Sequence, residues 1–203
     1  MAIEKILHTV EQFMPSCISG VFVEIGTDRG EGSTLWLANL AERMQTQLHT
    51  VDIRPHLDNM VLDPTSHRLG SSFDHITWHT AAGSTWAKDY GSIGQVISLL
   101  YLDNYDWTWQ SQGQVPRYLQ VQKIKYLNRF GIQLNNQDCQ IEHLKQIMYL
   151  ESWFCSDTVI VMDDTFYQNQ TWNGKCGPAV IWLLAQGYQI LSAENNGVIM
   201  SNH

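Results

Sequence analysis

The hydrophobic positions of this chain fall into short runs that are separated by polar, helix-compatible stretches. Runs rich in β-branched and aromatic residues predict buried strands over residues 20–25, 48–53, 75–80, 95–102 and 158–162. Hydrophobic residues at helical spacing from Ile3 to Met14 predict an amphipathic helix within residues 1–19 that ends near Pro15. Residues 33–43 and 178–186 also have helical patterns.

The order of these elements predicts how they are arranged. Alternating strands and helices indicate an α/β fold, a Rossmann-like doubly wound sheet that is mostly parallel. Residues 187–193 and 197–200 flank Asn195-Asn196-Gly197, a turn signal that predicts a C-terminal antiparallel hairpin. Residues 104–157 exceed the roughly one dozen residues of a simple crossover. We therefore expect a helical insertion between strands four and five, with helices over 117–129 and 140–154.

The composition is typical of a globular protein, and we expect residues 1–203 to form one domain. Hydrophobic residues make up 44% and charged residues 16% of the chain. The net charge of −8 argues against nucleic acid as the main partner, because phosphate binding favours a basic surface. Apolar runs are too short for a membrane span, the N-terminus has no signal-peptide pattern, and the cysteines form no CxxC pair. A cytoplasmic protein is the expectation.

Polar residues stand at the ends of the predicted strands, where open parallel sheets bind ligands. Glu24 closes the first strand, and Gly26 and Gly30 in the next turn would let a ligand approach the backbone closely. Asp52 ends the second strand, where a carboxylate can bind both hydroxyls of a ribose. Each feature alone fits an ordinary turn or strand end, but together they predict a nucleoside-type site.

The segment Val23-Glu-Ile-Gly-Thr-Asp-Arg-Gly30 resembles motif I of class I S-adenosylmethionine-dependent methyltransferases. Asp28 replaces the middle glycine of that motif, as in the branches similar to catechol and macrolide-sugar O-methyltransferases. By this resemblance, Asp52 binds the ribose and Ala82-Gly83-Ser84 flanks the adenine of the cofactor. The full set of cofactor-binding residues that the resemblance implies is Glu24, Gly26, Thr27, Gly30, Ser33, Asp52, Gly83, Ser84 and Asp103. NAD is the rival ligand, and it is disfavoured because its pyrophosphate would meet a carboxylate in this turn.

Carboxylates gather at the ends of the fourth and fifth strands. Asp103 ends the fourth strand, and Asp163 and Asp164 end the fifth. In a doubly wound sheet these two strands are neighbours, so we expect the three carboxylates to meet at one edge of the sheet. Their charges repel one another unless a cation lies between them. Oxygen ligands suit Mg²⁺, Ca²⁺ or Mn²⁺, and the resemblance to metal-dependent O-methyltransferases implies a metal, with Mg²⁺ expected, that acidifies a substrate hydroxyl. The alternative is that these residues are solvated strand ends and a turn cap.

A methyl transfer to a hydroxyl also needs a group that accepts the hydroxyl proton. Asp106 stands where the similar families carry a histidine or a lysine, so we expect Asp106, beside Asp103, to be catalytic. An aspartate can act as a general base if burial or neighbouring carboxylates raise its pKa. Asp106 as a fourth metal contact, or as a turn residue without chemistry, stays open.

Aromatic residues are frequent in the insertion and in the loop after the fifth strand, and loops at this edge of such folds form substrate walls. We expect Trp107, Trp109 and Tyr167 to contact a sugar or phenolic ring, and Lys175 to position an anionic substrate. For Lys175 a solvated side chain is the simpler interpretation. Aromatic residues such as Tyr126 would alternatively form the insertion's own core or a contact within a homo-oligomer.

The sequence thus predicts a metal-assisted O-methyltransferase that uses S-adenosylmethionine and acts on a glycosyl, polyol or phenolic hydroxyl of a small molecule. The alternative is a non-catalytic module of the same fold that binds a nucleoside or a protein partner.

Overall fold

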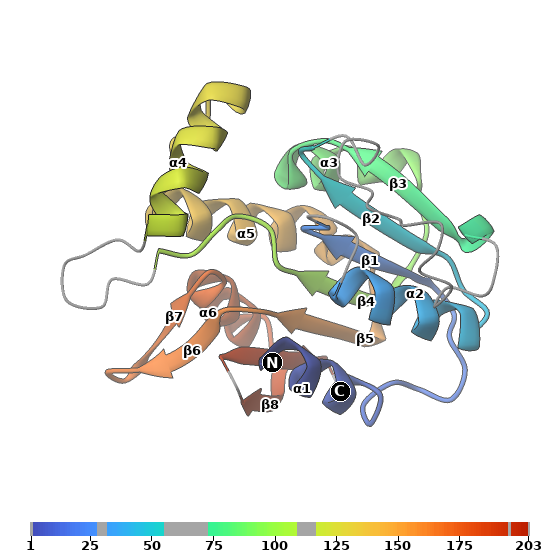
Figure 1. Ribbon diagram of the computed structural model, residues 1–203. Helices are drawn as coiled ribbons and strands as arrows, with labels where there is room; N and C mark the ends of the chain where they lie inside the picture. Colours follow the sequence, from blue (N-terminus) through green and yellow to red (C-terminus); the bar gives the residue numbers. More distant parts are fainter. Residues whose placement is uncertain (1, 28–31, 55–72, 109–116, 195, 203) are drawn as a thin grey trace.

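The structure is a computed structural model that describes residues 2–27, 32–54, 73–108, 117–194 and 196–202. Its main sheet has seven strands in the order β3-β2-β1-β4-β5-β9-β8 (Figure 1). These strands are β1 Val21–Ile25, β2 Leu48–Asp52, β3 Ile76–Thr80, β4 Ile97–Leu102, β5 Phe154–Met162, β8 Gln189–Glu194 and β9 Gly197–Ser201. Strands β6 Thr165–Gln168 and β7 Thr171–Gly174 form a separate hairpin. The helices are α1 Ala2–Val10, α2 Ser33–Arg43, α3 Gly83–Lys88, α4 Arg117–Phe130, α5 Asn136–Leu150 and α6 Gly177–Ala185.

Strands β1 to β5 run parallel, and β9 pairs antiparallel with both β5 and β8. The predicted α/β fold with a C-terminal hairpin is therefore confirmed. Asn196, in the predicted hairpin turn, has a φ of 61°, as such turns require. Strands β4 and β5 are neighbours, so their carboxyl ends lie side by side as expected.

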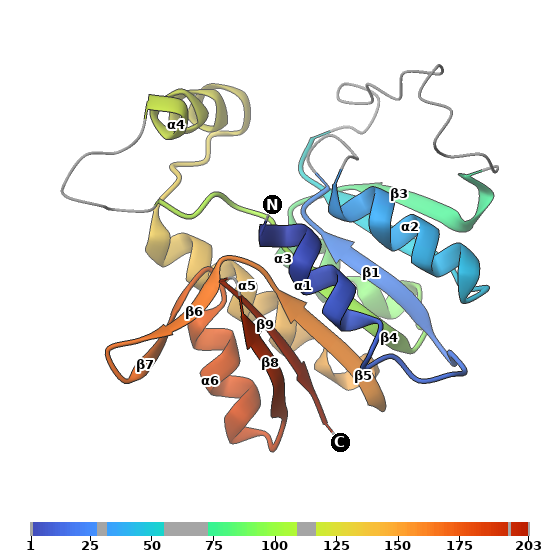
Figure 2. The same ribbon diagram turned by 60° about the horizontal axis from the view of Figure 1, so that its bottom comes forward.

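Alternate side chains of each strand pack into two separate cores, because successive residues of a strand point to opposite faces. Phe22, Leu99 and Val161 pack with buried residues of α1 and α2 on one face. Val23 and Leu100 pack on the other face with buried residues of α3, α5 and α6. Figure 2 shows helices on both faces of the sheet. Both faces being covered explains why the central strands are hydrophobic at nearly every position.

The insertion is helical, but its second helix begins and ends earlier than the periodicity predicts. Asn135 accepts a hydrogen bond at 2.8 Å from Asp138 N, and this cap starts α5 at Asn136. A 3₁₀ turn then leads from α5 directly into β5. Helix α4 stands apart from the layers of the sheet in Figures 1 and 2.

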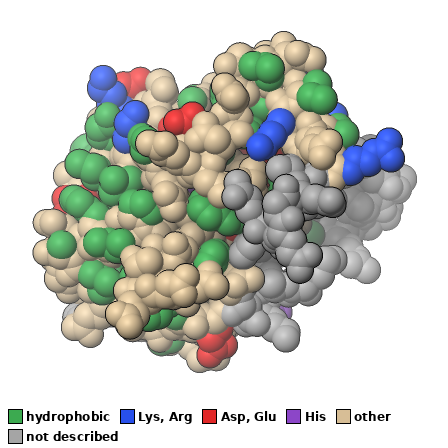
Figure 3. Space-filling view, turned by 90° about the vertical axis from the view of Figure 1, so that its left-hand side faces the viewer, with side chains coloured by type: hydrophobic (Ala, Val, Ile, Leu, Met, Phe, Trp, Pro, Cys, Tyr) green, Lys and Arg blue, Asp and Glu red, His purple; other side chains and the backbone are tan. Residues whose placement is uncertain are grey.

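The side of the molecule that carries α4, α6 and the β6–β7 hairpin is shown in Figure 3. Hydrophobic, acidic and basic side chains are all visible among polar ones there. The exposed large hydrophobic side chains of the helices include Ile124, Leu127, Met148 and Ile181. Within the described part of the chain, no helix combines the length and apolar character that a bilayer span needs.

Candidate functional site

A cavity of about 670 Å³ opens at the carboxyl ends of the parallel strands. Residues at or just after the ends of β1, β2, β3 and β4 line one wall, among them Gly26, Asp52, Ala82 and Asp103. Helices α4 and α5 of the insertion supply another wall, to which Tyr126 and Glu142 belong. The predicted ligand edge and the predicted insertion therefore enclose one space, and its volume is in the range of small-molecule sites.

Gly26 sits at the point where the chain leaves β1. Its φ is +112°, and a Cβ placed on it would collide with the backbone of Asn104 just beyond β4. A residue with a side chain would therefore push β1 and β4 apart at the cavity wall. Gly30, also predicted to bind the cofactor, lies outside the described residues.

Glu24 is completely buried and does not line the cavity. Its carboxylate accepts hydrogen bonds from Ser33 Oγ at 2.8 Å, Thr34 Oγ1 at 2.8 Å and Thr50 Oγ1 at 2.6 Å. Burial raises the pKa of Glu24 to about 7, although the hydroxyl groups oppose the shift. The cluster joins β1, β2 and the start of α2. Glu24 and Ser33 thus hold the end of β1 and the start of α2 together below the cavity surface.

Thr27 belongs to the same buried layer, since its hydroxyl is hydrogen-bonded to that of Thr50. Asp52, by contrast, lines the cavity. Its Oδ1 accepts a hydrogen bond at 2.8 Å from the backbone N–H of Arg54 and lies 3.4 Å from Arg54 Nε. These contacts orient the Asp52 carboxylate at the position where a ribose is expected.

The segment at the start of α3 is fixed by a residue of the insertion. Glu142 of α5 accepts a hydrogen bond from Ser84 N and another from Ser84 Oγ, both at 2.7 Å. Gly83 is packed so closely that a Cβ on it would collide with Gln146 of the same helix. Helix α5 therefore shapes the predicted adenine region, which the sequence pattern did not reveal because Glu142 lies 58 residues away from Ser84.

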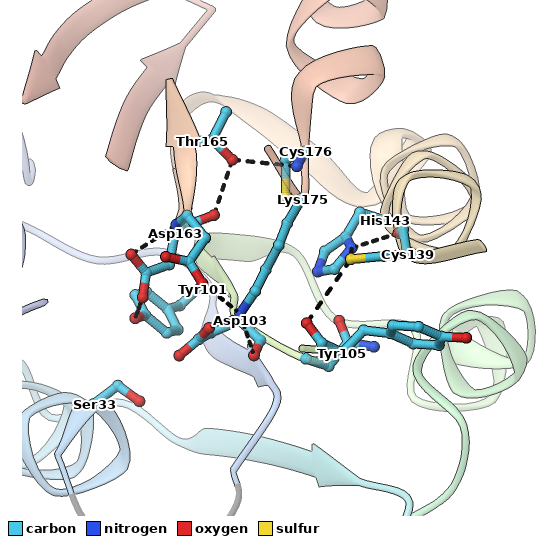
Figure 4. Close-up of polar contacts among 12 residues, drawn as sticks. Ser33, Tyr101, Asp103, Tyr105, Cys139, His143, Asp163, Thr165, Lys175 and Cys176 are labelled. Carbon is cyan, nitrogen blue, oxygen red and sulfur yellow. Dashed lines mark hydrogen bonds and ion pairs between the residues drawn. The ribbon is translucent and has the colours of Figure 1, made fainter. Parts of the chain in front are cut away.

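The predicted carboxylates do meet at the ends of β4 and β5, but a lysine lies among them (Figure 4). Lys175 Nζ is 2.5 Å from Asp103 Oδ1 and 3.1 Å from Asp164 Oδ2. Asp163 is buried, with its Oδ1 accepting a hydrogen bond from Asp164 N at 2.8 Å and its Oδ2 one from Tyr101 Oη at 3.4 Å. Only Asp103 and Lys175 of this group line the cavity.

The hairpin of β6 and β7 carries Lys175 back to the aspartates. Asn169 and Gln170 turn the chain with φ values of 52° and 61°, so that Thr165 pairs with Gly174. Lys175 N then donates a hydrogen bond to Asp164 O at 2.9 Å. Gly174 has a φ of +86°, and a Cβ on it would collide with the same carbonyl group. The tight return of the chain therefore depends on glycine at this position.

Lys175 is only 4% exposed, so the interpretation as a solvated lysine is wrong. Burial alone would lower the pKa of Lys175, but attraction to Asp103, Asp164 and Asp163 outweighs it and raises that pKa well above its ordinary value. Lys175 is therefore a buried ammonium at neutral pH. Burial and the neighbouring carboxylates Asp103 and Asp164 raise the pKa of Asp163 to about 7.

A divalent metal does not fit these side chains as they are arranged. The ammonium of Lys175 already lies within contact distance of two of the three predicted ligands, Asp103 and Asp164. Among the described residues, no group of three or more His, Cys, Asp or Glu side chains is placed so that it could hold a metal ion. The structure therefore gives no support to the predicted metal centre at Asp103, Asp163 and Asp164.

The predicted substrate residues are placed differently from one another. Lys175 and Asp106 line the cavity, whereas Trp107 and Tyr167 do not. Tyr167 is 60% exposed on the β6–β7 hairpin, where its ring packs against Trp172. Trp109 lies outside the described residues. Tyr126 lines the cavity and so does not serve only as core of the insertion.

Comparisons with known proteins show what fold this is. No family model matches the sequence, and no curated protein matches it. Among solved structures, the O-methyltransferase NovP is similar, with a TM-score of 0.54 at 13% identity over 98% of this chain and 78% of NovP. The TDP-rhamnose 3′-O-methyltransferase CalS11 of calicheamicin biosynthesis gives 0.57 at 12% identity, over 97% of this chain and 77% of CalS11.

A third similar structure is the glycopeptide N-methyltransferase MtfA complexed with S-adenosyl-L-homocysteine. Its TM-score is 0.51 at 9% identity, over 98% of this chain and 88% of MtfA. The chain has the fold of these methyltransferases. At such low identity the likeness establishes the fold, and the chemistry has to be argued from the cavity itself.

Proposed function

We propose that this protein is an S-adenosylmethionine-dependent methyltransferase that transfers a methyl group to a hydroxyl of a small molecule. The observation that carries the proposal is that Gly26, Asp52, Ala82 and Asp103 line a single cavity. Asp52 ends β2, and the other three residues follow β1, β3 and β4. The motif resemblance assigns Asp52 to the ribose and the segment from Ala82 to the adenine of the cofactor. The adenosyl group would contact Asp52 through its ribose and the Ala82–Ser84 segment through its base.

The acceptor would enter from the insertion side, where Tyr126 provides an aromatic surface in the same cavity that Asp106 and Lys175 line. In the reaction, a lone pair of the acceptor oxygen forms the new O–C bond while the S–C bond breaks and its electron pair stays on sulfur. The hydroxyl proton passes to a carboxylate, for which Asp106 is the candidate at the cavity wall. The protein contributes mainly orientation of the two reactants. A glycosyl, polyol or phenolic acceptor suits an aromatic and hydrogen-bonding wall.

Calorimetric titration with S-adenosylmethionine and S-adenosylhomocysteine tests the cofactor. We expect both to bind, and Asp52→Asn to weaken binding roughly tenfold because one charge-assisted hydrogen bond is lost. The matched control is Asp89→Asn, an exposed aspartate at the end of α3. Folded protein that binds neither compound would exclude the proposal.

The acceptor is tested separately with methyl-labelled cofactor and a panel of glycosides, polyols and phenols. Label should appear on oxygen in at least one class, and analogues in which that hydroxyl is replaced by hydrogen should stay unlabelled. If both compounds bind but the label is transferred only to amines, the assignment to oxygen is wrong. Binding without any transfer would favour the non-catalytic alternative.

A further inference from the structure

The wall of the cavity at the ends of β4 and β5 holds a buried ammonium group among carboxylates. The Lys175 side chain runs between Asp163 and His143, and its ammonium end reaches Asp103 (Figure 4). Three carboxylates would repel one another here without a cation. The ion pairs of Lys175 with Asp103 and Asp164 already supply that cation from within the chain.

The position of Lys175 relative to the cavity is the second observation. Asp163 and Asp164 do not line the cavity, whereas Asp103 and Lys175 do. A ligand in the cavity would therefore meet the ammonium group before it met those two aspartates. The side chain of Lys175 is 5% exposed, against 19% for Asp103 and 31% for Asp164, so the lysine is the most deeply held of the three.

Hydrogen bonds before and after Lys175 in the chain fix the position of its side chain. The backbone hydrogen bond from Lys175 N to Asp164 O fixes the start of the side chain, and Gly174 permits the close approach. Cys176 N donates to Thr165 Oγ1 at 3.2 Å, and Thr165 Oγ1 donates to Asp163 O at 2.9 Å, which fixes the next residue as well. Lys175 is therefore anchored on both sides of its Cα.

We propose that the ammonium group of Lys175 takes the place of a divalent cation at this wall, so that the acceptor hydroxyl is held against Lys175 and the protein works without a metal. This inference rests on the proposed function for the identity of the ligand. An ammonium group has three N–H donors. Two are directed at Asp103 and Asp164, and the third makes only a 3.4 Å contact with the backbone carbonyl of Asp103. This third N–H would turn to the hydroxyl oxygen, orient its lone pair and favour the loss of its proton to a neighbouring carboxylate. Because Lys175 is part of the chain, its positive charge is present whatever the concentration of metal ions.

The decisive experiment is a Mn²⁺ titration of the folded protein, followed by electron paramagnetic resonance of the free ion. We expect the wild-type chain to leave Mn²⁺ free. Lys175→Met should bind Mn²⁺ with an affinity at least about tenfold above the upper limit that the titration sets for wild type, because the aspartates then lack their cation. Lys175→Arg, which keeps the charge, should behave as wild type. Lys145→Met is the matched control, since it removes an exposed lysine of the same cavity.

Each outcome decides the inference. Wild-type protein that binds Mn²⁺, with binding lost in Asp163→Asn, overturns it, and so does a Lys175→Met variant that gains no Mn²⁺ affinity. If Lys175→Met does not fold, it is replaced by Lys175→Gln, which is neutral and similar in length. The wild-type titration does not depend on either variant. Cofactor binding is measured on the same samples by calorimetry. Failure of the cofactor to bind would overturn the proposed function while the Mn²⁺ result still decides the role of Lys175.

Discussion

The two sides of the cavity are built in different ways. On the side of β1, β2 and β3, the important residues lie at or just after the strand ends, and the Glu24 cluster joins β1 to β2 and to the start of α2. On the side of β4 and β5, the charge at the wall comes from Lys175, which reaches Asp103 across 72 residues. The comparison teaches that the strand-end residues of the first side can be located from the sequence pattern, whereas the charge of the second depends on where a hairpin returns.

The largest effect is expected from Lys175→Met, which removes the cation of the β4–β5 side. Breaking a buried ion pair by deleting one partner costs about 3–5 kcal/mol, because the other charge stays buried. The loss should be greater at pH 8 than at pH 5, since protonation of the remaining carboxylates relieves the repulsion. Urea unfolding at both pH values measures it. An equal loss in the control variant Lys145→Met would show that Lys175 has no special role in stability.

On the β1–β3 side of the cavity, the corresponding substitution is Gly26→Ala. A side chain at positive φ costs about 1–2 kcal/mol, and the collision with Asn104 adds to that, so we expect a loss of about 2–4 kcal/mol and weaker cofactor binding. Gly187→Ala is the matched control, because Gly187 has a φ of +95° with no atom near its missing Cβ. If both variants lose the same free energy of unfolding, close packing at Gly26 is not important.

The two sides also differ in how much of them could be predicted from the sequence. The parallel strands, the C-terminal hairpin and the adjacency of β4 and β5 all follow from runs of β-branched residues and turn signals. So does the presence of Gly26 and Asp52 at the ligand edge. Glu24 was predicted to contact the cofactor, and its burial under three hydroxyl groups could not be seen because Thr50 comes from another strand.

The hairpin of β6 and β7 was missed because its strands have four residues each and its turn contains no glycine. Helix α3 was missed because six residues are too few for a hydrophobic period. If the hairpin is not predicted, nothing in the sequence indicates that Lys175 lies near the aspartates. A metal ion is then the expected cation among the three carboxylates. The sequence did carry a signal for this hairpin. Thr165, Phe166 and Tyr167 are β-branched or aromatic, as is typical of a strand, and Thr171-Trp172 repeats that composition after a short gap.

The pH dependence of stability sharpens the comparison, because each side contains one carboxyl group whose pKa is raised to about 7. These are Glu24 on one side and Asp163 on the other. A raised pKa means that the folded state binds a proton that the unfolded state releases, so stability is greatest at acidic pH and is lost as the pH rises through about 7. The slope for each group reaches up to about 1.4 kcal/mol per pH unit between the unfolded pKa and the folded one.

Urea unfolding from pH 5 to pH 8 measures this slope. Glu24→Gln should flatten it, because the amide still accepts hydroxyl hydrogen bonds but no longer titrates. The remaining slope comes from Asp163 and Asp103, whose pKa values are also raised. Glu194→Gln, at an exposed position of β8, is the control and should leave the slope as it is. A profile that Glu24→Gln does not alter would mean that the buried carboxylate is not the titrating group.

A smaller effect is expected where the two sides meet, at the contact between Glu142 and Ser84. Glu142→Gln keeps the size of the side chain but replaces one acceptor oxygen by a donor, so one of the two hydrogen bonds to Ser84 is lost. We expect cofactor binding to weaken about fivefold to tenfold, or about 1–1.4 kcal/mol, as measured by calorimetry. Glu151→Gln, just after the same helix, serves as control. Unchanged binding would show that the insertion does not shape the adenine region.

The smallest effect concerns the turn that makes the β4–β5 side possible. Asn169 and Gln170 both have positive φ, and a two-residue hairpin turn with this geometry favours glycine at its second position. Gln170→Gly should therefore raise the free energy of unfolding by roughly 0.5 kcal/mol, the relief of backbone strain minus the entropy that glycine loses. Gln168→Gly, within β6, should lower it by a similar amount. Because Lys175 follows this hairpin directly, a Gln170→Gly variant that is less stable than wild type would contradict the turn geometry on which the placement of Lys175 depends.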